Sequence, residues 1–207
     1  LLIKGARSIA PAVETTFVSF PESAKLADVR EQVDDVRQDL FPVMDDEGRM
    51  IGIFTKSDLV TRDIDLLLRM ASAEVGISLN TSVDERAAIF EPGSPPPSRR
   101  LRAVRALVDS GIGTYVFLGP VIPTITDHDL DGLVNSLIET RVRSVMIDRL
   151  NLRPGMKERM ASIMAERSPS TLDEFLSSVD DDRFYDDLIA FLKRSLTDGG
   201  IVVVDAF

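Results

Sequence analysis

The sequence contains no cysteine and only one histidine, His128. Without thiols the chain can form no disulfide and cannot hold an iron–sulfur cluster through its own thiolates. A single imidazole also excludes a histidine-rich metal site, because zinc sites of that kind need three or four ligands. We expect no metal site in this chain, and we expect His128 to lie at a helix end rather than to act in catalysis.

Long hydrophobic runs are also missing. Runs such as Leu66–Leu68 and Ile201–Val204 are far shorter than the roughly 20 apolar residues that cross a bilayer. No signal-peptide pattern opens the chain. These features predict a cytoplasmic location, and Leu rather than Met at position 1 predicts that the sequence is part of a longer protein.

Basic residues are fewer than acidic ones, 24 against 34, which gives a formal net charge of −10. Nucleic acids and anionic membranes are bound through clustered Lys and Arg. We therefore expect no membrane or nucleic-acid partner and favour a small, nucleotide-like ligand. With 207 residues, 44% of them hydrophobic, the chain can bury a core in one or two domains.

Strand and helix patterns alternate along the chain, which predicts an α/β fold with a parallel sheet. Residues 16–20 predict a strand, residues 24–36 a helix, and residues 41–44 and 50–54 a hairpin that turns near Gly48.

Further elements follow from apolar periodicity and from capping, Gly and Pro residues. In chain order they are helix 58–69, strand 74–79, a short helix capped by Thr81 or Ser82, a rigid proline-rich loop 91–98, helix 99–109 capped by Ser98 and ended by Gly111, strand 114–118, a turn shaped by Pro120 and Pro123, helix 126–140, strand 142–147, helix 154–166, a helix capped by Thr171 and Glu174, helix 184–196 after the acidic start 180–182, and edge strand 201–204.

The most informative stretch is residues 51–60, where an apolar strand turns into a helix through the polar residues 55–58. Hydroxyls, amide donors and a lysine at such a junction can meet the carboxylate or phosphate of a ligand. The alternative is that Thr55 or Asp58 only caps the helix.

The sequence Phe41–Gly48 followed by Ile51–Asp58 resembles the second half of a CBS domain, a regulatory module that commonly binds adenine nucleotides. The resemblance implies a β-α-β-β-α unit over residues 1–59, in which Thr55 and Asp58 contact a ribose. CBS repeats normally work in pairs, and one is visible here. The resemblance therefore predicts a homodimer through this segment.

A second resemblance covers residues 52–207 and overlaps the first at residues 52–59. It rests on six blocks in order: 55–67, 75–80, 90–93, 98–101, 119–127 and 148–154. They resemble the later part of a radical S-adenosylmethionine (SAM) domain of the spore-photoproduct-lyase-like group, a lyase-like enzyme family. This implies a partial (β/α) barrel, or an open parallel sheet with C-terminal helices, that holds SAM against a 4Fe–4S cluster.

By motif, the resemblance implies that Lys56 and Ser78, at the ends of two neighbouring strands, approach SAM. An ammonium and a hydroxyl can bind the methionyl carboxylate or the ribose. Asn80, Glu91 and Arg100 are further candidates near the same strand ends. For Glu91 and Arg100 the alternative is a structural salt bridge that fixes the proline-rich loop.

The chain departs from this family in two respects. The three closely spaced cysteines that ligate the cluster and the glycine-rich turn that seats the amino-acid end of SAM are both missing. We therefore expect the chain alone to be inactive and at most to bind SAM or a related nucleotide. The alternative is a CBS-type regulatory module that binds an adenine nucleotide.

Overall fold

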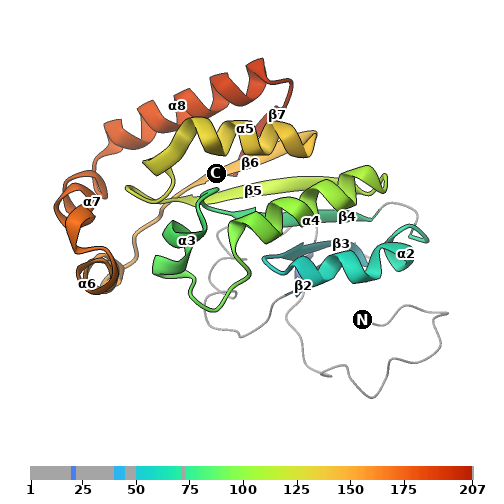
Figure 1. Ribbon diagram of the computed structural model, residues 1–207, viewed down its shortest axis with the longest axis horizontal. Coiled ribbons are helices and arrows are strands. Elements are labelled where there is room, and N and C mark those ends of the chain that lie inside the picture. Colours follow the sequence, from blue (N-terminus) through green and yellow to red (C-terminus); the bar gives the residue numbers. More distant parts are fainter. Residues whose placement is uncertain (1–19, 22–39, 45–49, 71–72, 207) are drawn as a thin grey trace.

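The computed structural model describes residues 20–21, 40–44, 50–70 and 73–206 (Figure 1). Its strands form one seven-stranded sheet in which the spatial order follows the chain. The strands are β1 Phe20–Pro21, β2 Leu40–Met44, β3 Met50–Thr55, β4 Glu74–Leu79, β5 Gly113–Val121, β6 Ser144–Arg149 and β7 Val202–Asp205. Strands β3 to β7 are parallel to one another, which confirms the predicted parallel α/β sheet.

The predicted hairpin is also confirmed, because β2 and β3 pair antiparallel from Leu40 opposite Thr55 to Met44 opposite Met50. Strand β1 runs parallel to β2 and begins at the last residue of the predicted strand 16–20. Residues 16–19, the predicted helix 24–36 and the turn at Gly48 lie outside the described residues.

Helices join the parallel strands. They are α2 Ile64–Leu67, α3 Asp84–Phe90, α4 Pro97–Asp109, α5 Leu130–Thr140, α6 Met156–Arg167, α7 Leu172–Ser178 and α8 Asp182–Asp198, with 3₁₀ turns η1 Asp58–Asp63, η2 Asp127–Asp129 and η3 Pro169–Thr171. In the described ranges, no helix combines the length and the apolar character that a membrane span requires.

Three helices cover one face of the sheet: α4, α5 and α8 lie side by side across it (Figure 1). Successive side chains of a strand point to opposite faces, so every second strand residue meets these helices. The buried core between the two layers includes Val75, Ile77 and Leu79 of β4, Val116 and Leu118 of β5, Val104 and Leu107 of α4, Leu133 and Leu137 of α5, and Leu188 and Leu192 of α8.

The other face carries the alternate strand residues, among them Ser78, which is paired with Phe117 on β5. The rings of Phe54 and Phe117 meet edge to face on this side, with centroids 5.3 Å apart. Helices α3, α6 and α7 gather beyond one end of the sheet (Figure 1). The arrangement of one helical layer outside a parallel sheet is that of a partial (β/α) barrel.

Two predicted helix starts are wrong. Helix α4 begins at Pro97 rather than after a Ser98 cap, because the amide and hydroxyl of Ser98 both donate to the carboxylate of Asp84. Pro is favoured at a first helical position, where its missing N–H is not needed. Likewise Val83 precedes α3, and the hydroxyl of Thr81 accepts the Val83 amide rather than an amide of the helix.

Other helix boundaries differ as well, among them 154–166, which is observed as α6 Met156–Arg167, and 184–196, which is observed as α8 Asp182–Asp198. The predicted helix 58–69 is the 3₁₀ turn η1 followed by the single turn α2, with Ser57 as the cap of η1. The predicted helix 126–140 begins as η2, and Asp129 caps α5.

Strand β5 is longer than predicted. It continues through Pro120 to Val121, so the prediction that Pro120 shapes a turn is wrong. Proline offers no N–H to a neighbouring strand, and the pairing of β5 with β6 accordingly shifts between Leu118 and Val121.

Candidate functional site

The candidate site lies where two neighbouring parallel strands end. Thr55, the last residue of β3, pairs with Ile77 of β4. Lys56 and Asn80 each follow the last residue of their strand, and Ser78 is the last but one residue of β4. Carboxyl ends of parallel strands share one edge of the sheet, which is the usual ligand position in α/β folds.

Glu91 links the two strand ends to helix α4. One carboxylate oxygen, Oε1, accepts hydrogen bonds from Lys56 Nζ at 2.7 Å and from Asn80 Nδ2 at 3.5 Å. The other oxygen, Oε2, accepts one from Arg100 Nη2 at 2.5 Å. The structure thus brings Lys56, Asn80, Glu91 and Arg100 together, as the sequence predicts.

Arg100 also holds the backbone around it. Its Nη1 donates to the carbonyl of Ser78 at 3.1 Å and its Nε to the carbonyl of Pro95 at 2.7 Å. The predicted salt bridge between Glu91 and Arg100 is therefore present, and it ties the proline-rich loop to strand β4. Ser78 enters this network through its carbonyl oxygen.

Burial separates these side chains into two groups. Arg100 and Asn80 are each 1% exposed, whereas the side chain of Lys56 is 42% exposed. Burial raises the pKa of the Glu91 carboxyl, but the charges of Lys56 and Arg100 and their hydrogen bonds outweigh it and hold that pKa below its usual range. Glu91 is therefore an anion at neutral pH, and Lys56 is the exposed cation of the group.

Asn80 contains a polar atom that the protein does not satisfy. Its Oδ1 is buried and has no hydrogen-bond partner in the described ranges. Leaving such an acceptor unpaired costs about 1–3 kcal/mol. A donor on a ligand would offset this cost.

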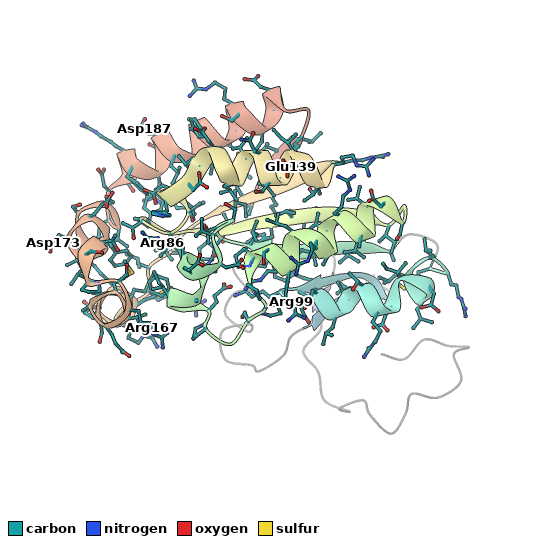
Figure 2. All side chains as sticks on the ribbon, viewed as in Figure 1. Arg86, Arg99, Glu139, Arg167, Asp173 and Asp187 are labelled. Carbon is teal, nitrogen blue, oxygen red and sulfur yellow. The ribbon has the colours of Figure 1, made fainter. Side chains whose placement is uncertain are left out.

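The two residues of the nucleotide alternative have structural partners. Thr55 Oγ1 accepts the amide of Ser57 at 2.9 Å, but the cap of η1 is Ser57 rather than Thr55 or Asp58. Asp58 pairs with Arg99, which lies near the start of α4 (Figure 2), at 2.7 Å from Nη2 and 2.8 Å from Nε. The second oxygen of Asp58 is buried and unpaired in the described part of the chain.

The loop after β5 contains a strained residue that the sequence does not predict. Thr124 has a φ of 65°, which is unfavourable for a β-branched residue. It is 4% exposed, and its hydroxyl oxygen has no partner among the residues described. Burial raises the pKa of the nearby Asp127 carboxyl. Hydrogen bonds from the backbone amides of Asp127 and Thr124 act in the opposite direction but do not offset this effect.

Over the described residues, no group of three His, Cys, Asp or Glu side chains could hold a metal ion. His128 is exposed in the 3₁₀ turn η2, next to helix α5. The acidic residues 180–182 stand at the start of α8, where Asp181 is the cap and accepts the amide of Arg183.

Comparison with known proteins gives one family. The model of the radical SAM superfamily matches residues 2–137, a range that includes most of the CBS-like segment. The uncharacterized protein MJ0683 of Methanocaldococcus jannaschii is 39% identical over 82 residues, which are 40% of this chain and 32% of that protein. The uncharacterized protein Rv2578c of Mycobacterium tuberculosis is 27% identical over 133 residues, 62% of this chain and 39% of that protein.

This chain thus spans between 32% and 40% of the length of the curated relatives that it matches. Among solved structures, a mutant of spore photoproduct lyase superposes with a TM-score of 0.51 at 13% identity, over 87% of this chain and 55% of that chain. This likeness shows a shared fold and confirms the predicted partial barrel.

Proposed function

Because this chain belongs to the radical SAM superfamily, we propose that it binds SAM at the carboxyl ends of β3 and β4. The observation that carries the proposal is the meeting of an exposed cation, Lys56, with a buried unpaired acceptor, Asn80 Oδ1, around one carboxylate.

These residues fit the amino-acid end of SAM. Within the described part of the chain the Lys56 ammonium makes one hydrogen bond, to Glu91, so two of its three N–H donors can serve a carboxylate. Asn80 Oδ1 can accept a hydrogen bond from an ammonium or a hydroxyl group. Lys56 would hold the ligand by charge, and Asn80 would fix its orientation.

The iron–sulfur cluster of the family does not fit this chain. Such clusters are held by cysteine thiolates, and the sequence has no cysteine. When present, the cluster supplies the electron that the family's chemistry needs. We therefore assign binding, and no radical step, to the residues of this chain alone.

The test is ligand-induced stabilisation. A ligand that binds only the folded state at 100 times its Kd raises the free energy of unfolding by about 2.7 kcal/mol. We expect SAM to raise the urea midpoint in this way and Lys56→Met to reduce the increase. Lys193→Met is the matched control, because Lys193 is 40% exposed and pairs with Asp205 at 2.7 Å on the far edge of the sheet.

Two outcomes would contradict the proposal. If SAM leaves the midpoint unchanged at millimolar concentration, the chain does not bind it. If AMP or ATP stabilises the chain and SAM does not, the CBS-type alternative replaces the proposal, and Asp58→Asn then becomes the informative variant.

A further inference from the structure

Glu91 has a position that neither a ligand contact nor a simple structural salt bridge explains. Its Oε1 contacts two residues from two neighbouring strand ends, Lys56 at 2.7 Å and Asn80 at 3.5 Å. These are the two side chains through which the proposed ligand would be held. A single carboxylate oxygen therefore determines where both of them point.

The Glu91 carboxylate is also bound through its other oxygen. Arg100 binds Oε2 at 2.5 Å and is in turn fixed by the carbonyls of Ser78 and Pro95. All three nitrogens of the Arg100 guanidinium donate to protein acceptors, so Arg100 supports the carboxylate rather than a ligand. A guanidinium that two backbone carbonyls hold in place limits the movement of the carboxylate that it binds.

The orientation of the Asn80 amide follows from this contact. Its Nδ2 donates to Glu91, so Oδ1 must face away from the carboxylate. If the amide were turned over, its oxygen would face an anionic oxygen with no hydrogen between them, which is repulsive. Glu91 therefore keeps the Asn80 acceptor in the orientation in which it is buried and unpaired.

Glu91 is a poor ligand contact in its own right. Its side chain is 10% exposed and is already shared among two cations and an amide. Its negative charge would also repel the carboxylate that Lys56 is expected to bind. Its influence on a ligand must pass through Lys56 and Asn80.

We propose that Glu91, fixed by Arg100, is a positioning residue that orients Lys56 and Asn80 for ligand binding. This inference rests on the proposed function for its ligand, SAM. It deepens that function by separating the residues that touch the ligand from the residue that aligns them.

The first arm of the test needs no ligand. The side-chain amide resonances of Asn80, assigned with Asn80→Ala, are recorded by NMR in the wild type, in Glu91→Gln and in Ile189→Val. Ile189 lies in the core on α8, so its variant reports the effect of lost stability alone. We expect a shift in Glu91→Gln and none in Ile189→Val, whereas an unchanged Asn80 resonance in Glu91→Gln would overturn the proposal.

The second arm measures the Kd for SAM by titration calorimetry. We expect Glu91→Gln to raise the Kd about tenfold, which corresponds to 1.4 kcal/mol, and Glu91→Asp, whose carboxylate is too short to reach both partners, to act in the same direction. Ile189→Val should leave the Kd unchanged.

A double-mutant cycle with Lys56→Met distinguishes positioning from a structural role. If Glu91 acts through Lys56, the combined factor is smaller than the product of the two separate factors. Factors that simply multiply, or a Glu91→Gln variant that binds as tightly as the wild type, would overturn the positioning role. If the wild type binds no SAM, the proposed function is refuted instead. The NMR comparison would still test whether Glu91 positions the Asn80 amide, because it needs no ligand.

Discussion

Replacing Arg100 with methionine removes the buried cation of the site while filling much of its volume. Within the described residues the guanidinium makes three hydrogen bonds, to the carbonyl of Pro95 at 2.7 Å, the carbonyl of Ser78 at 3.1 Å and Glu91 at 2.5 Å. Breaking a buried ion pair by removing one partner costs about 3–5 kcal/mol. Because two carbonyls also lose a donor, we expect Arg100→Met to fall in the upper part of this range.

Such a loss is a large fraction of the roughly 5–15 kcal/mol that stabilises a typical domain. Urea unfolding followed by circular dichroism measures it, and Arg69→Met is the control. Arg69 is 75% exposed and lies 3.8 Å from Asp65, so its variant should lose about 0.5 kcal/mol or less.

The double variant Arg100→Met with Glu91→Gln tests the reason for the loss. It should be more stable than Arg100→Met alone, because the carboxylate that has lost its buried partner is then neutral. A loss below about 1 kcal/mol in Arg100→Met would refute the view that this ion pair is a buried structural support, as would a double variant less stable than the single one.

Three further predictions concern stability. Thr124→Gly should raise the free energy of unfolding by about 1 kcal/mol, because glycine adopts the φ of 65° without strain; a lower melting temperature in calorimetry would contradict this. Gly119→Ala should lower the free energy of unfolding, measured with urea, by about 1–3 kcal/mol, because the new methyl group would lie 2.8 Å from the Cβ of Asp148. An unchanged free energy would show that the backbone there can move to relieve the clash. Glu91→Gln should be less stable than the wild type by its full amount above about pH 5, and this difference in the free energy of unfolding should shrink as the pH falls through the lowered pKa of Glu91. A difference that stays constant in urea titrations from neutral to acidic pH would argue against this.

The presence of most strands was predictable because it depends on local pattern. Strand β4 has the predicted bounds, 74–79, and the hairpin of β2 and β3 has the predicted pairing. Gly111, with a φ of 81°, ends α4 as expected. Alternating apolar residues and glycine punctuation determine these features within a few residues of the chain.

The failures occurred where a distant residue determines the local structure. The hydroxyl of Ser98 caps nothing in its own helix, because Asp84, 14 positions earlier, accepts its hydrogen bonds. Pro120 lies inside β5 because its neighbouring strand pairs on either side of it. Neither contact has a signal in the nearby sequence.

The sequence predicted that four of the five candidate side chains lie close together, but it did not predict which of them are buried and which are accessible. Strand ends and motif positions were enough to bring Lys56, Asn80, Glu91 and Arg100 to one edge of the sheet. Arg100 is buried and Lys56 is accessible. This difference depends on the packing of α4 against β4, which the spacing of residues in the sequence does not reveal. The strained Thr124 was also missed, because threonine is not a residue type that signals a positive φ.

The most direct test of the account is a crystal structure of this chain with SAM. We expect the amino-acid end of the molecule at the carboxyl ends of β3 and β4, with its carboxylate on Lys56 Nζ and a donor on Asn80 Oδ1, while Glu91 keeps its contacts to both side chains. SAM bound at another edge of the sheet, or an Asn80 oxygen that remains unpaired in the complex, would contradict it.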